Sequence, residues 1–336
     1  MDSIKQRMEK WEKFADLNSD ISKLCVVHCA EGMPEQPMLW WENIEHRIEW
    51  SYGCYEKYIE QTEWLMDDKV PYLTAITGTE IIAEAFGCRV HYPSDMNPFA
   101  LPLVKNSIEA SRLALPKLCD TKLTLAFEMA DKLKSRAGAD ALLSLPDIQS
   151  PLDVAALIWD KTDFFAAMLE EPNAVKELMH KITEFMFEFL DEWFKRYGKA
   201  FMAHYPDFYM PYGISMSIDE IGVISRELFN VFEAPALNAF RKRYGALGLH
   251  CCADSVHQWE NIKKIEGIQI LNLVRGEAET LQSLKAFQDC CGLFLNTYVS
   301  HPGEADKDKL HVAFIRYAET KDEALRMLEQ FNRDWR

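Results

Sequence analysis

The chain has no long apolar run. No stretch of its 336 residues approaches the roughly 18 consecutive apolar residues that a membrane-spanning helix needs. Its first 14 residues, MDSIKQRMEKWEKF, are polar and amphipathic and lack the apolar segment of a secretory signal peptide. We therefore expect no membrane insertion and a cytoplasmic protein, whose nine cysteines stay reduced and form no disulfide framework.

Basic residues are also scarce. The sequence holds 37 Lys and Arg against 53 Asp and Glu, a formal net charge of −16, which argues against a nucleic-acid or anionic-membrane partner. Apolar residues, in contrast, make up 48% of the chain, enough for a sizeable core. The length fits one large α/β barrel or two smaller domains, and no low-complexity linker divides the chain.

Helical and strand patterns alternate along the sequence. Ser150 and Pro151 are expected to begin one helix, as N-cap and first helical residue, and Gly198 to end a long amphipathic one. The alternation predicts parallel βαβ units. The expected helices include residues 3–17, 256–265, 278–288 and one from 321, and the expected strands residues 24–30, 70–79, 142–145, 246–249, 268–274, 293–299 and 310–318.

The stretch GALGLHCCADSVHQ, residues 245–258, carries the most informative chemistry. If residues 246–249 form a strand that runs on into HCC, then His250 and Cys252 point to the same side, because alternate side chains of a strand share a face. An imidazole and a thiolate are two ligands of the kind that zinc prefers. A buried strand end with an ordinary thiol and a hydrogen-bonded histidine is the alternative.

An aromatic and methionine-rich segment precedes this stretch. Tyr205, Asp207, Tyr209 and Tyr212 lie in it, and they are expected to contribute to a substrate pocket if the segment follows a barrel strand. Asp219, a little further on, is a candidate catalytic carboxylate. A tyrosine-rich loop packed under its own side chains is the alternative.

Two further candidates lie outside that segment. Trp41, in an aromatic-rich helical stretch, is a candidate pocket residue, with core packing as its alternative. Asp254 is a second candidate catalytic residue, and Asp254 and His257 are candidates to hold the second ring nitrogen of His250. For each, a surface polar residue at the start of a loop is the favoured alternative.

Three segments resemble the uroporphyrinogen decarboxylase-like superfamily. AEAFG (83–87), SPLDVAALI…EEPNAVKELMHKIT (150–183) and SIDEIGVISRELFNVFEAPALNAFRKRYG (217–245) are similar to its landmarks, and HCCADS stands where the methyltransferase branch carries an H-x-C zinc motif. The resemblance covers roughly residues 25–330. It implies one (β/α)8 TIM barrel over residues 1–336, with an N-terminal helix in residues 1–20 packed on it.

The resemblance also implies an activity. Its methyltransferase branch uses zinc, takes the methyl group from a methylated corrinoid on a partner protein, and passes it to a small thiol or related acceptor. Related barrels often pair, so a homodimer is an open expectation. Two other functions stay open: a decarboxylase or lyase of a smaller substrate without zinc, and a non-catalytic protein that binds a corrinoid or tetrapyrrole.

The sequence departs from the family pattern in three places. Thr77-Gly78-Thr79 stands where the true decarboxylases carry an aspartate. HCAEGMPEQPMLWW (28–41) lacks the arginine cluster with which true decarboxylases bind their carboxylate-rich substrate, so uroporphyrinogen decarboxylation is not expected. No cysteine follows Cys291, although the methyltransferase branch has one after its last strand. Glu277 and His301, each just past a strand, are therefore the candidates for a third zinc ligand.

Overall fold

Six parallel strands form the largest sheet of the computed structural model, which describes residues 2–75, 77–93 and 96–336. Its order is β1-β10-β9-β8-β7-β6, so the first and the last strand of the chain are neighbours. The strands are mostly apolar and buried, as expected where helices cover a parallel sheet. Their bounds are Lys23–Cys29 (β1), Ile214–Ser217 (β6), Leu247–Cys251 (β7), Ile268–Leu273 (β8), Gly292–Leu295 (β9) and Val312–Ala318 (β10).

Three further segments continue this sheet into a ring. Parallel bridges join Gln149 to Ser217 of β6, Ser144 to Met202, and Leu73 to Leu143. The N–H of Asp68 donates to the carbonyl of Cys25 in β1 at 2.8 Å. Residues 201–202, 143–149 and 68–73 thus stand between β6 and β1. The chain has the α/β architecture of a TIM barrel, as the sequence predicted.

The strand expected over residues 70–79 is reduced to one bridge at Leu73, and Ile76 within it lies outside the described residues. Side chains replace the missing main-chain ladder. Carboxylate oxygens of Asp68 and Asp67 accept hydrogen bonds from the N–H groups of Cys25 (2.9 Å) and Val27 (2.8 Å) in β1. This edge of the ring therefore depends on two buried aspartates.

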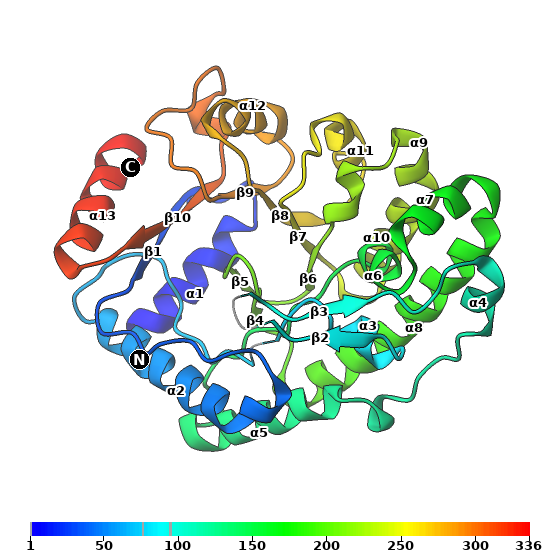
Figure 1. The fold of residues 1–336 in the computed structure, drawn as a ribbon. Helices are drawn as coiled ribbons and strands as arrows, with labels where there is room; N and C mark the ends of the chain where they lie inside the picture. Colours follow the sequence, from blue (N-terminus) through cyan, green and yellow to red (C-terminus); the bar gives the residue numbers. More distant parts are fainter. Residues whose placement is uncertain (1, 76, 94–95) are drawn as a thin grey trace.

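Helices surround the strands (Figure 1). Ser150 caps α6 through a hydrogen bond from the N–H of Asp153, Pro151 is its first residue, and α8 ends before Gly198, all as predicted. The helices are α2 (Ile44–Gln61), α3 (Ile81–Ala85), α4 (Ser107–Arg112), α5 (Leu123–Ala137), α6 (Pro151–Ile158), α7 (Lys161–Glu170), α8 (Pro172–Tyr197), α9 (Arg226–Leu228), α10 (Ala234–Tyr244), α11 (Trp259–Ile262), α12 (Glu277–Phe287) and α13 (Lys321–Trp335).

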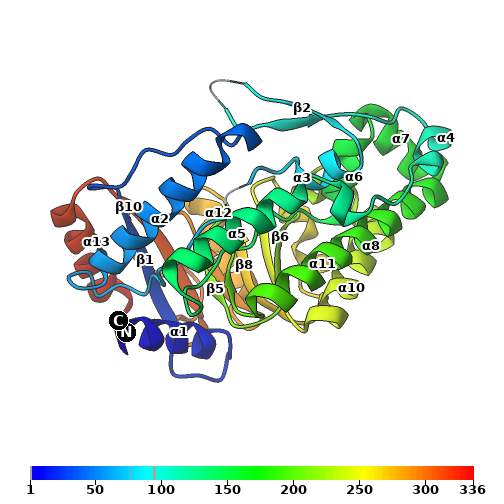
Figure 2. The ribbon, with the colours of Figure 1, turned by 90° about the horizontal axis from the view of Figure 1, so that it is seen from below.

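The N-terminal helix α1 (Asp2–Phe14) packs on the end of the barrel where the strands begin. The indole N–H of Trp11 donates to the carbonyl of Asp68 at 2.8 Å, and Phe14 fills the space beside Gly292, the first residue of β9. Figure 2 shows α1 at this end and β2 (Arg89–His91), which pairs with β3 (Phe99–Leu101), near the other. The first helix leaves the opposite end, where the strands finish, free for a site.

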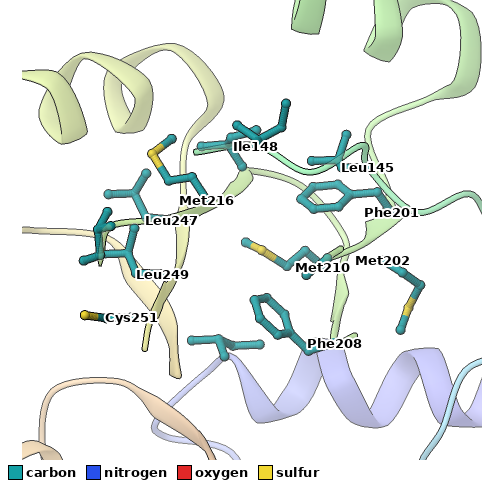
Figure 3. Packing of buried hydrophobic residues seen from close by; sticks show 14 of the residues in the cluster. Leu145, Ile148, Phe201, Met202, Phe208, Met210, Met216, Leu247, Leu249 and Cys251 are labelled. Carbon is teal, nitrogen blue, oxygen red and sulfur yellow. The ribbon is translucent and has the colours of Figure 1, made fainter. Parts of the chain in front are cut away.

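After residues 201–202, which belong to the ring, the chain turns back into the barrel interior. Strand β4 (Phe201–Met202) pairs antiparallel with β5 (Tyr209–Met210), and Figure 3 shows Phe208 and Met210 pointing toward Leu249 and Met216. A Cβ atom on Gly248 of β7 would lie only 2.8 Å from both Phe208 and Met210. Only glycine leaves room for the hairpin there.

The helices of the described ranges include none that is both long and apolar enough to span a lipid bilayer.

Candidate metal centre

Three side chains with metal-binding atoms converge where β6 and β7 end. Asp219 follows β6, His250 lies in β7 and Cys252 follows β7, and one ligand atom from each lies within 4.8 Å of the others. His250 is buried, Asp219 is half-buried and Cys252 is exposed, so the group opens to the barrel mouth. His250 and Gly248 are two positions apart in β7, so they lie on the same face of the strand, which is the inward one.

His250 is held in one orientation by a neighbouring strand. Its Nδ1 lies 2.6 Å from Oδ1 of Asn272, its register partner in β8, and the amide of Asn272 donates in turn to Oδ1 of Asn296 at 2.8 Å. An amide oxygen can only accept, so Nδ1 carries the proton and Nε2 is left as the ligand atom.

A buried carboxylate of α6 fixes the backbone turn that carries Asp219. Asp153, buried in the first turn of α6, accepts hydrogen bonds from the N–H groups of Asp219 (2.7 Å) and Glu220 (3.0 Å). Oδ1 of Asp219 accepts from the N–H of Cys252 at 2.6 Å. Asp219 is thereby tied to the loop that bears Cys252.

The donor set fits zinc. Imidazole nitrogen, thiolate sulfur and carboxylate oxygen are its protein ligands, and atoms bound to one tetrahedral zinc lie roughly 3–4 Å apart. The ligand atoms of the three side chains lie within 4.8 Å of one another, so they need to move only slightly closer to bind one ion. Burial and the nearby Asp219 raise the pKa of Cys252 to about 11, so the thiol is protonated at neutral pH unless a cation replaces its proton.

A buried carboxylate lies behind this group. A π-helical turn over Phe229–Glu233 brings Glu233 to Ser150, whose hydroxyl donates to Oε2 of Glu233 at 3.2 Å. Burial raises the pKa of Glu233 to about 8, partly offset by Ser150. Glu233 is therefore protonated in the folded protein at neutral pH.

This protonation makes stability depend on pH. Between the ordinary pKa of 4.5 and about 8, the folded state holds a proton on Glu233 that the unfolded chain has lost, so stability falls as pH rises through this window. Glu233→Gln stays neutral and keeps the Ser150 contact. We expect it to be more stable than the native chain at pH 8, by of the order of a few kcal/mol, and little changed at pH 4.5.

Urea unfolding at the two pH values measures this difference, with the exposed Glu319→Gln as control. If the free energy of unfolding depends on pH equally in the native protein and in Glu233→Gln, then Glu233 is not the protonated group.

Glu277 and His301, the expected third ligands, lie elsewhere. Glu277 is the exposed first residue of α12, and His301 is exposed and accepts a hydrogen bond at Nδ1 from the N–H of Gly303. Asp219 lies beside His250 and Cys252 instead, because the parallel register places Ser217 of β6, two residues before it, beside His250 of β7.

The expected support of His250 by Asp254 or His257 is not observed. Asp254 is exposed and its carboxylate turns to the N–H of Val256, and His257 binds the carbonyl of Ile224. Both follow the end of β7, whereas Asn272 reaches the ring directly from β8.

The four candidates of the aromatic segment divide between the two ends of the barrel. The Tyr205 ring lies edge-on to His250 with centroids 5.1 Å apart, and Asp207 binds His28 of β1.

The other two lie at the opposite end. Tyr209 is buried, with its hydroxyl 3.4 Å from Glu12 of α1. Tyr212 accepts a hydrogen bond from Gln269 and lines a cavity of about 450 Å³ at the amino ends of the strands. The reversal from β4 to β5 explains the split.

Trp41 belongs to a separate cluster. Its indole N–H donates to Glu84 at 2.9 Å, and the guanidinium of Arg47 lies 5.0 Å above its ring. Its buried position fits the core-packing alternative.

Several residues of the mouth were not found from the sequence. A small pocket beside His250 and Tyr205 is also lined by Asp147 and His204, whose side chains lie 3.7 Å apart. Asn272 and Asp153 were missed too. In the sequence each of them is only a polar residue within or next to an apolar segment, and this pattern does not indicate which residue it binds.

Known proteins resemble this chain at two levels. The family model of uroporphyrinogen decarboxylase (URO-D) matches residues 73–289, which include all three metal-binding candidates. No curated protein matches the chain by sequence. A solved methyltransferase from Methanosarcina mazei is 12% identical, with a TM-score of 0.67 over 97% of this chain and 98% of that one, a likeness of fold.

Proposed function

Since the chain belongs to the uroporphyrinogen decarboxylase (URO-D) family, we propose that within it this protein is a zinc-dependent methyltransferase. It moves a methyl group between a corrinoid carrier, supplied by a partner protein, and a small thiol or related acceptor. The likeness of fold to a methanogen methyltransferase supports this choice. So does the absence of an arginine cluster in residues 28–41 for a carboxylate-rich tetrapyrrole.

One observation carries the proposal: the convergence of Asp219, His250 and Cys252. Three protein ligands and an open fourth position are typical of catalytic zinc sites, whereas structural sites use four protein ligands. Asp219, His250 and Cys252 would hold the zinc ion, which would supply a Lewis acid that favours the thiolate form of an acceptor thiol, the form that attacks a methyl group, in place of a general base.

The protein's own residues set up this chemistry. Asn272 keeps Nε2 of His250 free and directed at the site, and Asp153 fixes the backbone that carries Asp219. Tyr205 covers one side of His250 at the mouth. Because the mouth is open at the exposed Cys252, a carrier protein can approach it from solvent.

Metal analysis tests the proposal. Protein purified without added metal is expected to hold about one zinc per chain, and His250→Ala and Cys252→Ala are expected to lose it. Cys290→Ala, which also removes an exposed cysteine, serves as the matched control and keeps the metal. Native protein, but neither site variant, is then expected to transfer methyl from a methylated corrinoid to thiols.

Unchanged zinc in both site variants would refute the site. Zinc that is bound without any methyl transfer would refute the activity.

A further inference from the structure

A small polar pocket lies beside His250 at the barrel mouth. It is enclosed by residues 143–149, the segment after β4, and the strands β6 and β7. Ser217 of β6 is the register partner of His250, so the two strands form one wall. Only His250 also belongs to the metal group. The polar side chains of the lining are Asp147, His204, Tyr205, Ser215, Ser217 and His250.

Asp147 presents a free carboxylate to this pocket. Its side chain is 15% exposed, and its oxygens accept no hydrogen bond from any residue that the structure describes. Nε2 of His204 lies 3.7 Å from Oδ2 of Asp147, which is too long for a hydrogen bond. The backbone N–H of Asp147 donates to Oγ1 of Thr77 at 2.8 Å. The residue is therefore held in place while its carboxylate stays available to a ligand.

The surroundings of this carboxylate favour a cation. The described residues that line the pocket include no Lys or Arg. Burial raises the pKa of Asp147, and the neighbouring His204 and His250 act to lower it. A bound cation stabilises a largely buried carboxylate, whereas an anion beside it adds like-charge repulsion. A ligand with a positive group is therefore favoured here over one with a carboxylate or sulfonate.

The size of the pocket restricts the ligand group further. Its cavity volume is about 10 Å³, the space of roughly one water molecule. A primary ammonium has one heavy atom and fits this space, whereas a sulfonate or carboxylate has several. An ammonium can only donate hydrogen bonds, and the carboxylate of Asp147 and the hydroxyl oxygens of Ser215 and Ser217 can accept them. Charge, volume and hydrogen bonding thus favour the same group.

We propose that Asp147, with Ser215 and Ser217, binds the ammonium group of the methyl acceptor, and that this acceptor is a short aminothiol rather than an anionic thiol. The role of the ligand rests on the proposed function: the pocket and the metal group share His250, so one short molecule can reach both. Recognition of the ammonium group itself needs neither zinc nor corrinoid.

Ligand-observed NMR titration of the full chain, treated with a chelator and kept reduced, tests the pocket. The probes are 2-aminoethanethiol, 2-mercaptoethanol and 2-mercaptoethanesulfonate, which share one thiol and one carbon chain and differ in the charge of the other end. The aminothiol is expected to bind best and the sulfonate worst. Asp147→Asn is expected to weaken the aminothiol roughly tenfold and to leave 2-mercaptoethanol unchanged. A variant that failed to fold would weaken both.

Asp191→Asn is the matched control, because it removes an exposed carboxylate at the other end of the barrel, and it is expected to change none of the three affinities. No binding of the aminothiol, equal or tighter binding of the sulfonate, or an aminothiol affinity that Asp147→Asn leaves unchanged would overturn the pocket assignment.

Methyl transfer by the zinc-loaded chain separates this proposal from the proposed function. The aminothiol is expected to be the best acceptor of the three. Transfer that prefers the sulfonate would refute the pocket assignment and leave the methyltransferase in place. No transfer to any probe, with the binding preference intact, would refute the activity and leave the ammonium pocket in place.

Discussion

Asp219→Ala is expected to lower zinc affinity by more than the roughly 10- to 100-fold that losing an outer-shell partner of a metal ligand costs. The substitution removes one of three converging ligand atoms and leaves His250 and Cys252 in place. It also removes the acceptor for the N–H of Cys252, so the loop that bears the thiol loses an anchor. Competition with a chromophoric zinc chelator measures the loss.

The matched control is Asp254→Ala, two residues beyond Cys252. Asp254 is exposed and its carboxylate caps a local turn at Val256, so its removal is expected to leave zinc affinity unchanged. Glu277→Ala and His301→Ala are likewise expected to keep the metal. If Glu277→Ala or His301→Ala lowers zinc affinity and Asp219→Ala does not, then the substituted glutamate or histidine is the third ligand, and Asp219 is not.

Arg7→Met is expected to lower the free energy of unfolding by about 3–5 kcal/mol, the usual effect of breaking a buried ion pair by removing one partner. The guanidinium of Arg7 pairs with Asp67 and donates to the carbonyls of Lys69 (2.9 Å) and Leu65 (2.6 Å). Both side chains of the pair are at most 5% exposed. Without Arg7, the carboxylate that binds the N–H of Val27 loses its counter-charge.

Chemical denaturation measures this loss, with Arg136→Met as the control. Arg136 makes two hydrogen bonds to Glu49, but both side chains are largely exposed, and solvent-exposed pairs contribute little. Equal destabilisation by the two substitutions would show that burial of the Arg7 pair is not what secures the barrel edge at β1.

The sequence predicted those parts of the fold that local patterns determine. The alternation of apolar segments gave the parallel architecture, and the Ser150–Pro151 start of α6 follows from capping chemistry. The shared face of His250 and Cys252 also follows from the period of a strand. These two residues converge in the structure although β7 ends at Cys251, one residue before Cys252.

The third member of the candidate metal group could not be predicted in this way. Asp219 is 31 positions from His250 in the printed sequence, and the register of two parallel strands brings them together. Asn272 reaches His250 through the next register pair. A single sequence carries no signal for either register, so the positions that follow other strands, Glu277 and His301, were equally reasonable.

The β4–β5 hairpin misled the assignment of pocket residues for a different reason. Its strands are two residues long, too short to show a period of two. Because the sequence shows residues 205–212 as one irregular segment, we expected all four candidates in it to contribute to one pocket at the barrel mouth. The chain instead turns back through the barrel, which leaves Tyr205 and Asp207 at the mouth and carries Tyr209 and Tyr212 to the opposite end.

X-ray absorption at the zinc edge, on purified native protein and on Cys252→Ser, tests the central claim most directly. We predict zinc with a single sulfur neighbour at about 2.3 Å and nitrogen or oxygen neighbours at about 2.0–2.2 Å, with the sulfur neighbour absent from Cys252→Ser. Protein without zinc, or a zinc spectrum that Cys252→Ser leaves unchanged, would contradict the account.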